Sequence, residues 1–248
     1  MEINKDAELR RLYKDLAWLW QIISPAESYV KETEFIIKMI NIYAKRNIQT
    51  LLHLGCGGGH HDFTFKRFLK VTGVDISDEM LYFAKKLNKE VHYLNGDIRD
   101  LRLEEKYDVV AILDSIVYMK TEDELLQAFR TAHEHLEPGG VFVTLCKISK
   151  ENFFNELNSQ SIHIKGTVEV VSFKNFHDHD PRDTFIEGLY FFIIRENKKV
   201  KVEIDQHIFG IFSIELWKEM LKSAGFEVNI VEFNLRETKL PMFICIKK

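Results

Sequence analysis

The first half of the chain carries glycines and an aspartate at a spacing that suits the binding of a nucleoside. An apolar run ends at Gly55, Gly57, Gly58 and Gly59, and a second apolar run ends at Asp75. Glycine lets a backbone turn sharply and approach a ligand, and the N-terminus of a following helix favours negative charge. A carboxylate at the end of the next strand can accept hydrogen bonds from two ribose hydroxyls. We therefore expect strand, glycine-rich turn, helix and strand around a cofactor that contains a nucleoside.

The glycine spacing leaves two classes of cofactor open. The dinucleotide fingerprint is G-x-G-x-x-G, and His60 stands where its last glycine is required. The pattern that remains is G-x-G-x-G, which Gly59 closes. Asp75 follows Gly55 by 20 positions, a distance that suits either class. A nicotinamide-dependent oxidoreductase is therefore one alternative function.

Motifs further along the chain favour the other class. TGVDIS, the run Asn95-Gly96-Asp97-Ile98, YDVVAILDS and LEPGGVFVTL follow HLGCGGG in that order. Together they resemble the motifs of class I S-adenosylmethionine (SAM)-dependent methyltransferases. YKDLAWLW, DSIVYMKTEDEL and the β-rich stretch after the fifth strand resemble the branch that contains sugar-amine N,N-dimethyltransferases. The resemblance implies a Rossmann-like α/β sheet of seven strands, mostly parallel with an antiparallel last strand, plus a small antiparallel β insertion.

The resemblance also implies a set of cofactor-binding residues. The glycine turn would face the methionine part of SAM, and Asp75 would hold the ribose. Asp97 would accept a hydrogen bond from the adenine amino group, and Tyr13 would close over the cofactor. The product would be S-adenosyl-L-homocysteine (SAH). The full expected set is Tyr13, Gly55, Cys56, Gly57, Gly59, Asp75, Ile76, Met80, Asp97, Ile98 and Leu113.

Methyl transfer asks little of the protein beyond alignment and the exclusion of water. A neutral nitrogen acceptor needs only a free lone pair, whereas a hydroxyl acceptor needs a base. Asp114 and Tyr118 follow the fourth strand, where the resembled family meets its acceptor, and His207 ends the inserted β stretch. We take these three as candidate catalytic residues. A structural role is an equally good interpretation of Tyr118, and His207 could equally be a strand histidine bonded to backbone.

Histidines elsewhere admit other interpretations. His177-Asp178-His179-Asp180 contains two types of metal ligand, but it precedes Pro181 and is more typical of a solvated turn. We therefore expect no metal site. His60 and His61 belong to the glycine turn, where we expect a backbone amide and packing rather than catalysis.

The composition indicates which classes of partner and which cellular compartment to expect. The net charge of −4 and the pI of about 6.2 give no electrostatic footprint for nucleic acid. No apolar run is long enough to span a membrane. Three widely spaced cysteines indicate reduced thiols in the cytoplasm. We expect a small-molecule methyl acceptor, with N-methylation slightly favoured over O-methylation, and a possible homodimer. A SAM sensor or the partner subunit of another methyltransferase is the non-catalytic alternative.

The order of elements predicts three regions. Residues 1–45 would be helices that cover the cofactor site. Residues 46–150 and 211–248 would form the SAM-binding α/β core, because strands and helices alternate there. Residues 151–210 would be a β-rich insertion that caps the substrate.

Local signals set the expected boundaries within these regions. Apolar spacing predicts a helix over 6–22, and Ser24 with Pro25 predicts the start of a second. Three antiparallel strands are expected between 166 and 212. Thr121 and Ser213 are expected to cap helices, the second of which ends at Gly225, and two final strands follow over 226–233 and 241–247.

Overall fold

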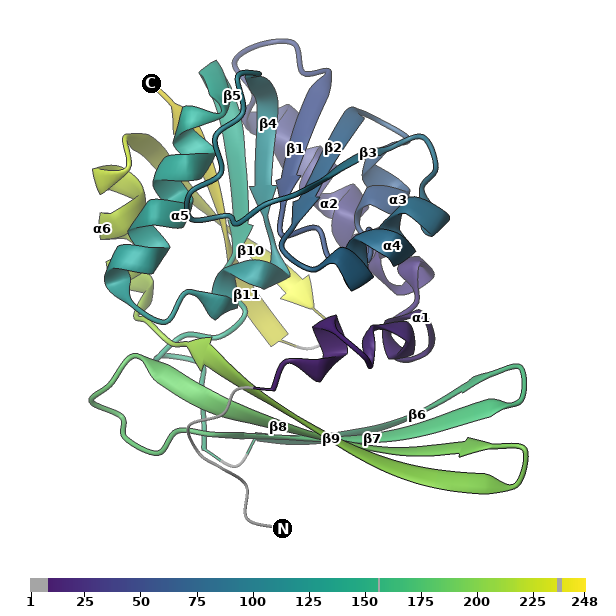
Figure 1. Cartoon of the computed structure of the whole chain (residues 1–248). Helices are drawn as coiled ribbons and strands as arrows, with labels where there is room; N and C mark the ends of the chain where they lie inside the picture. The colour runs from purple at the N-terminus through teal and green to yellow at the C-terminus, as the bar shows by residue number, and fades with distance from the viewer. Residues whose placement is uncertain (1–8, 156, 236–237) are drawn as a thin grey trace.

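The computed structural model describes residues 9–155, 157–235 and 238–248. Figure 1 shows two sheets, a large one flanked by helices and a small one below it. The large sheet has seven strands in the order β10-β11-β5-β4-β1-β2-β3, and β11 is antiparallel to both of its neighbours. The predicted Rossmann-like sheet is therefore confirmed. Its strands are β1 (Thr50–Leu54), β2 (Lys70–Asp75), β3 (His92–Asn95), β4 (Tyr107–Ile112), β5 (Leu136–Leu145), β10 (Phe226–Leu235) and β11 (Thr238–Lys247).

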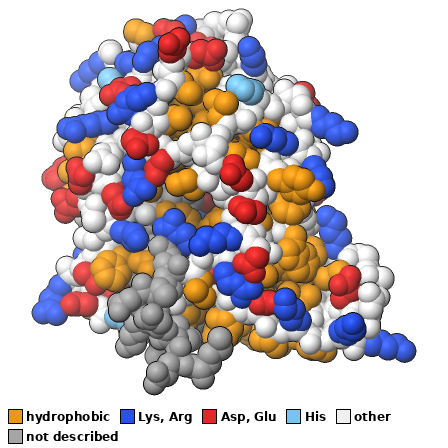
Figure 2. All heavy atoms as spheres, viewed as in Figure 1, with side chains coloured by type: hydrophobic (Ala, Val, Ile, Leu, Met, Phe, Trp, Pro, Cys, Tyr) orange, Lys and Arg blue, Asp and Glu red, His pale blue; other side chains and the backbone are white. Residues whose placement is uncertain are grey.

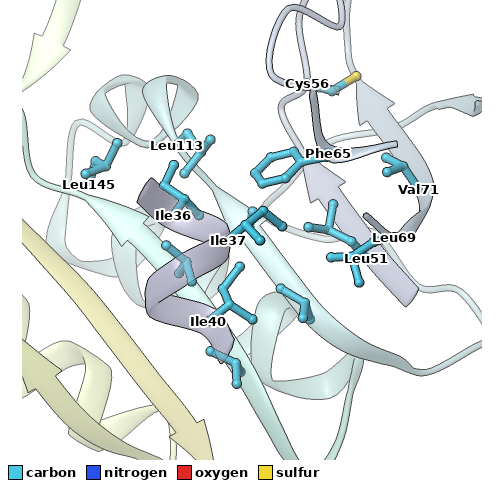
Figure 3. Close-up of a cluster of buried hydrophobic side chains, with 14 of the residues drawn as sticks. Ile36, Ile37, Ile40, Leu51, Cys56, Phe65, Leu69, Val71, Leu113 and Leu145 are labelled. Atoms are coloured by element: carbon cyan, nitrogen blue, oxygen red, sulfur yellow. The ribbon is translucent and has the colours of Figure 1, made fainter. Parts of the chain in front are cut away.

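Helices cover both faces of the large sheet. Successive strand residues point to opposite faces, so Leu51 packs under α2 and α4 while Leu52 packs under α5 and α6. Figure 3 shows Ile36, Ile37 and Ile40 of α2 directed at the first face. Because both faces are buried, the strands are nearly continuous apolar runs. The helices are α1 (Trp20–Ile23), α2 (Val30–Tyr43), α3 (Asp62–Phe65), α4 (Asp78–Leu87), α5 (Glu122–Glu134) and α6 (Ile214–Ser223).

Side-chain caps fix the starts of α5 and α6. The hydroxyl of Thr121 accepts from the N–H of Glu124, and that of Ser213 accepts from the N–H of Leu216, each at 3.2 Å. Both predicted caps are confirmed. Such caps contribute about 1 kcal/mol each, because they satisfy backbone donors that the helix itself cannot. After α6, Gly225 adopts a φ of 102°, which ends the helix as expected.

The prediction of one helix over 6–22 is wrong. Residues 6–8 lie outside the described part, and the rest form two 3-10 turns, η1 (Arg11–Tyr13) and η2 (Ala17–Leu19), before the short α1. The physical reason is a competing acceptor. The carboxylate of Asp205 accepts from the backbone N–H groups of Arg11 at 2.8 Å and Leu12 at 2.7 Å. A side chain that takes these donors offers the backbone an alternative to a helix.

The predicted cap at Ser24 is also wrong. Its hydroxyl makes a 2.7 Å hydrogen bond with the hydroxyl of Tyr29 and caps no helix. Pro25 precedes a further 3-10 turn, η3 (Ala26–Tyr29), which leads into α2. The result is that Tyr29 is fixed at the beginning of α2, where it faces the glycine turn.

The small sheet has four strands instead of the predicted three. They are antiparallel in chain order: β6 (Leu157–Lys165), β7 (Val168–His177), β8 (Phe185–Glu196) and β9 (Lys199–Gly210). The sequence signal of β6 was weak because only Ile162 and Ile164 alternate among polar residues in its second half. The turn between β8 and β9 lies at Asn197 and Lys198, which have φ values of 49° and 64°.

Residues 9–23, the N-terminal segment, lie between the two sheets (Figure 1). Leu12, Leu16 and Leu19 pack on Val170 and Phe192 from the inner face of the small sheet. This apolar contact fixes the segment over the carboxyl ends of the large sheet's strands.

Candidate active site

A cavity of about 680 Å³ lies at the carboxyl ends of the large sheet's strands. Along this edge the strands run β3, β2, β1, β4 and β5, so the residues that follow them form a row. Ligands of open α/β sheets bind at this edge, and the volume is typical of a small-molecule site. Its walls come from the glycine turn, the N-terminal segment, the start of α4 and the loop after β4.

The glycine turn follows β1 and forms the floor of the cavity. Gly55, Gly57 and Gly59 have φ values of 69°, 54° and 72°, which strain any other residue. A Cβ on Gly55 would also lie 2.0 Å from the hydroxyl oxygen of Ser115. The tight turn therefore brings the backbone of residues 55–58 to the surface of the cavity.

Asp75 ends β2 beside this turn. One carboxylate oxygen accepts from the N–H of Gly57 at 2.7 Å, and the other accepts from the N–H of Ser77 at 2.9 Å. Burial raises the pKa of Asp75, and the two N–H groups offset part of that effect. A carboxylate oxygen can accept more than one hydrogen bond, so Asp75 retains capacity for a ligand's hydroxyls.

Asp97 and Ile98 lie at the β3 end of the cavity. The guanidinium of Arg99 binds Asp97 through two nitrogens, with the shortest distance 2.6 Å, and lowers the pKa of that carboxyl. Arg99 also binds Glu124 at 2.7 Å. Asp97 is thus held in place as a carboxylate, with Ile98 and the exposed side chain of Ile76 supplying apolar surface.

An ion cluster that the sequence analysis missed lies at the opposite end. The ammonium of Lys147 is 2.5 Å from Asp114 and 3.0 Å from Glu32. Burial alone would raise the pKa of Asp114, but the ammonium of Lys147 outweighs it and holds that pKa well below its usual range. Asp114 is 48% exposed, yet that surface faces the cavity. Asp114 was predicted because it follows a parallel strand at the ligand-binding edge of the sheet. The same reasoning indicates Lys147, which follows β5 at that edge.

The chain is similar to known methyltransferases in sequence and in fold. A family model described as a methyltransferase domain matches residues 51–140. A dTDP-3-amino-3,4,6-trideoxy-alpha-D-glucopyranose N,N-dimethyltransferase of Streptomyces venezuelae is 31% identical over 186 residues, which are 74% of this chain and 77% of that protein. The chain belongs to the class I SAM-dependent methyltransferases.

Solved structures of methyltransferases share the whole fold. DesVI of Streptomyces venezuelae superposes with a TM-score of 0.83 at 24% identity, over 100% of both chains. SAM-bound CalS10, an amino pentose methyltransferase from Micromonospora echinaspora, gives 0.81 at 20% identity, again over 100% of both. Because the chain belongs to the SAM-dependent methyltransferases, its cofactor is SAM, and the nicotinamide alternative is set aside.

Most residues that the resemblance assigned to the methyltransferase site line one cavity. Gly59 and Leu113 do not, and neither does His207. Gly59 faces the other way, since a Cβ there would lie 2.5 Å from the hydroxyl of Tyr93. Those that line the cavity are Tyr13, Gly55, Cys56, Gly57, Asp75, Ile76, Met80, Asp97, Ile98, Asp114 and Tyr118.

His207 stands behind Tyr118 in a buried chain of polar groups. Nδ1 of His207 is 2.7 Å from the hydroxyl of Tyr118, which is 3.0 Å from the hydroxyl of Tyr13. Nε2 donates to Asp205 at 2.7 Å. Burial raises the pKa of Tyr118 well above its usual value, so this tyrosine is a neutral phenol. In this methyltransferase His207 orients Tyr118 and Tyr13, and these two side chains form part of the cavity wall.

The segment at 177–180 forms the turn between β7 and β8. Asp180 pairs with Arg182 at 2.7 Å, and His179 lies 3.0 Å from Glu187. Within residues 9–155, 157–235 and 238–248, no group of three or more potential ligand residues is placed to hold a metal ion. The described helices include none that is long and apolar enough to cross a membrane.

Proposed function

We propose that this methyltransferase transfers a methyl group from SAM to the amine of a small molecule, with an amino sugar as the preferred class. The observation that carries the proposal is the extent of the cavity. It continues from Asp97 and Asp75 past the glycine turn to Asp114, which leaves room for an acceptor beyond the cofactor. The names of the relatives support an amine acceptor. The Streptomyces venezuelae relative is a sugar N,N-dimethyltransferase, and CalS10 is an amino pentose methyltransferase.

The residues would act mainly by position. SAM supplies an activated methyl group, and the chemical step is an in-line displacement that needs alignment and a dry site. Asp75 would hold the ribose and Asp97 the adenine amino group. Tyr13, Trp20 and Tyr118 would wall the reacting atoms off from water, since all three line the cavity.

We also propose the roles of the three regions on this basis. Residues 1–45 would cover the cofactor, a role that the lining residues Tyr13 and Trp20 support. Residues 46–150 and 211–248 would bind SAM. Residues 151–210 would cap the substrate indirectly, because no described residue of the small sheet lines the cavity, while His207 of β9 holds Tyr118.

A binding and turnover experiment tests the function. Calorimetry with SAM and SAH should give binding to both. Incubation with SAM and a panel of amino sugars, free amines and hydroxylated acceptors should add one or two methyl groups to an amine, as read by mass spectrometry. Methylation of hydroxyls alone would contradict the amine proposal. Tight SAM binding with no transfer to any class would favour a sensor or a partner subunit.

We propose that two copies pair through the outer face of the small sheet. Ile162, Val171, Ile193 and Val202 lie in register across its four strands. Ile162 and Val202 are 67% and 61% exposed, and Ile164 is 71% exposed. A contiguous apolar face of this kind is typical of an interface between subunits.

Charge substitutions on that face should separate the copies. Ile164→Lys combined with Val202→Lys should convert a dimer to a monomer in sedimentation, because each buried ammonium would lack a partner. Ile42→Lys is the matched control: Ile42 is 61% exposed on α2, away from the small sheet, and its change should leave the dimer intact. A wild-type protein that sediments as a monomer at high concentration would contradict the pairing.

We propose that the acceptor is no nucleic acid and that the protein acts in the cytoplasm. Lys and Arg side chains are interspersed with Asp and Glu over the face in Figure 2, and the net charge is −4. Cys56, Cys146 and Cys245 are all free and buried, which suits a reducing compartment. Salt-dependent binding to DNA or RNA would contradict the first statement, and recovery outside the cytoplasmic fraction would contradict the second.

A further inference from the structure

One ring nitrogen in the wall of the cavity has no partner. His61 precedes α3, is 5% exposed and lines the cavity. Its Nε2 atom is buried without a hydrogen bond, and its ring packs edge-on against Tyr29 at 4.7 Å. A buried polar atom without a partner is costly, so its presence here indicates a role toward a ligand.

The other ring nitrogen fixes the tautomer of His61. The hydroxyl of Thr33 donates to the carbonyl of Tyr29 at 2.8 Å, which uses its one hydrogen. The same oxygen lies 2.9 Å from Nδ1 of His61, and we assign Nδ1 as the donor of that hydrogen bond. Nδ1 therefore carries the proton of the neutral ring, and Nε2 presents a lone pair to the cavity.

Asp114 is the nearest charged group to that lone pair. Its carboxylate is 3.9 Å from Nε2, which is longer than a hydrogen bond. Lys147 bridges Asp114 and Glu32, so two carboxylates share one ammonium and the cluster has a net negative charge. A cationic group that enters between Asp114 and His61 would meet both an anion and a hydrogen-bond acceptor.

The remaining titratable groups around His61 add no positive charge that would repel a cation. His60 is neutral at pH 7, since burial lowers its pKa to about 4. His53 contacts the ring at 6.0 Å and is bonded at 2.6 Å to the carboxylate of Asp62. Tyr29 is a neutral phenol, because burial raises its pKa to about 12.

We propose that Asp114 and His61 form the acceptor's amine site, in which Asp114 attracts the ammonium form and Nε2 of His61 accepts its proton. This rests on the proposed transfer to an amine. The ammonium R–NH₃⁺ gives one proton to His61, and the freed nitrogen lone pair forms a bond to the methyl carbon. The carbon–sulfur bond breaks and its electron pair stays on sulfur, which gives SAH and R–NH₂⁺–CH₃. The imidazolium, stabilised by Asp114, returns its proton to solvent before a second transfer.

The site can be probed without knowledge of the acceptor. Sinefungin is a SAM analogue with an ammonium-bearing carbon in place of the methylated sulfur, and SAH lacks that group. Calorimetry with each ligand from about pH 5 to 8, the range over which histidines titrate, gives a sinefungin-to-SAH preference. We expect wild-type protein to prefer sinefungin about tenfold at pH 8, because its ammonium makes a charge-assisted hydrogen bond. The preference should fall as the pH is lowered, because an imidazolium at this position would repel the ammonium.

Three variants separate the contribution of Asp114 to the sinefungin preference from that of His61. Asp114→Asn should reduce the preference to about twofold while leaving SAH affinity intact. His61→Asn should keep the hydrogen bond to Thr33 but make the remaining preference independent of pH. His60→Asn lines the same cavity and is the matched control, which should keep the wild-type pH dependence. If thermal melting shows that His61→Asn does not fold, His61→Gln replaces it.

Each other outcome has a distinct meaning. Equal affinities of wild-type protein for the two ligands would overturn the amine site, as would pH dependence that survives in the His61 variant. Equal weakening of sinefungin and SAH by Asp114→Asn would overturn it too, because the cluster would then hold the amino-acid end of the cofactor. If wild-type protein bound neither ligand, the proposed methyl transfer would fail and the amine site with it.

Discussion

Replacing Asp75 with alanine is expected to raise the dissociation constant for SAM by about ten- to a hundredfold. The change removes a carboxylate that can accept from the ribose, and charged hydrogen bonds of this type are worth about 1.5–3 kcal/mol. It also leaves the N–H of Gly57 without its 2.7 Å acceptor, which loosens the glycine turn. Calorimetry gives the affinity, and circular dichroism on heating reports whether the fold persists.

Asp100→Ala is the matched control for that experiment. Asp100 is an exposed aspartate that does not line the cavity, so its loss should leave the SAM affinity unchanged. If Asp75→Ala bound SAM within about twofold of wild-type protein, the ribose contact would be the wrong assignment for this carboxylate.

Replacing Asp205 with alanine is expected to lower the free energy of unfolding by about 3–5 kcal/mol, the usual cost of breaking a buried charged pair. Asp205 is fully buried and accepts from His207 and from the N–H groups of Arg11 and Leu12. Its loss leaves these three donors unsatisfied, together with the N–H of Gln206, which donates to the same carboxylate at 2.9 Å, and it releases the N-terminal wall of the cavity. Urea unfolding at pH 7 measures the difference.

The pH dependence of that difference has a definite sign. Burial by itself raises the pKa of Asp205, but His207 and the two N–H groups outweigh it and lower that pKa. The stabilisation is therefore present above the unfolded value of about 4 and is lost as the pH falls below it. Asp15→Ala is the control, because the exposed pair of Asp15 with Arg11 is worth about 1 kcal/mol at most. Equal stability of wild-type protein and Asp205→Ala at pH 7 would contradict this role.

Signals local in sequence predicted the core of the fold. The apolar runs that end at Gly55 and Asp75 became β1 and β2, and the caps at Thr121 and Ser213 formed as expected. These features depend on neighbours a few residues away, so the sequence carries them directly. For the same reason the residues placed after parallel strands, such as Asp97 and Asp114, fell together at one edge.

Contacts between distant segments account for what the sequence did not predict. The N-terminal helix over 6–22 failed because Asp205, 194 positions from Arg11, takes its backbone donors. Likewise, the orphaned nitrogen of His61 depends on Thr33, 28 positions earlier, and Lys147 meets Glu32 only because α2 packs beside β5. A residue's own neighbours in sequence contain none of this information.

The two faces of the small sheet make different contacts. Its inner face supports the short turns that hold Tyr13 over the cavity, and its outer face exposes Ile162, Ile164 and Val202. These turns are held on the small sheet by Asp205 and by buried leucines, so a shift of that sheet would uncover the cavity and let SAH leave. A subunit clamped to the outside would stiffen the platform under those turns. Dimerisation would then slow the release of SAH, although no residue of the partner subunit would lie at the active site.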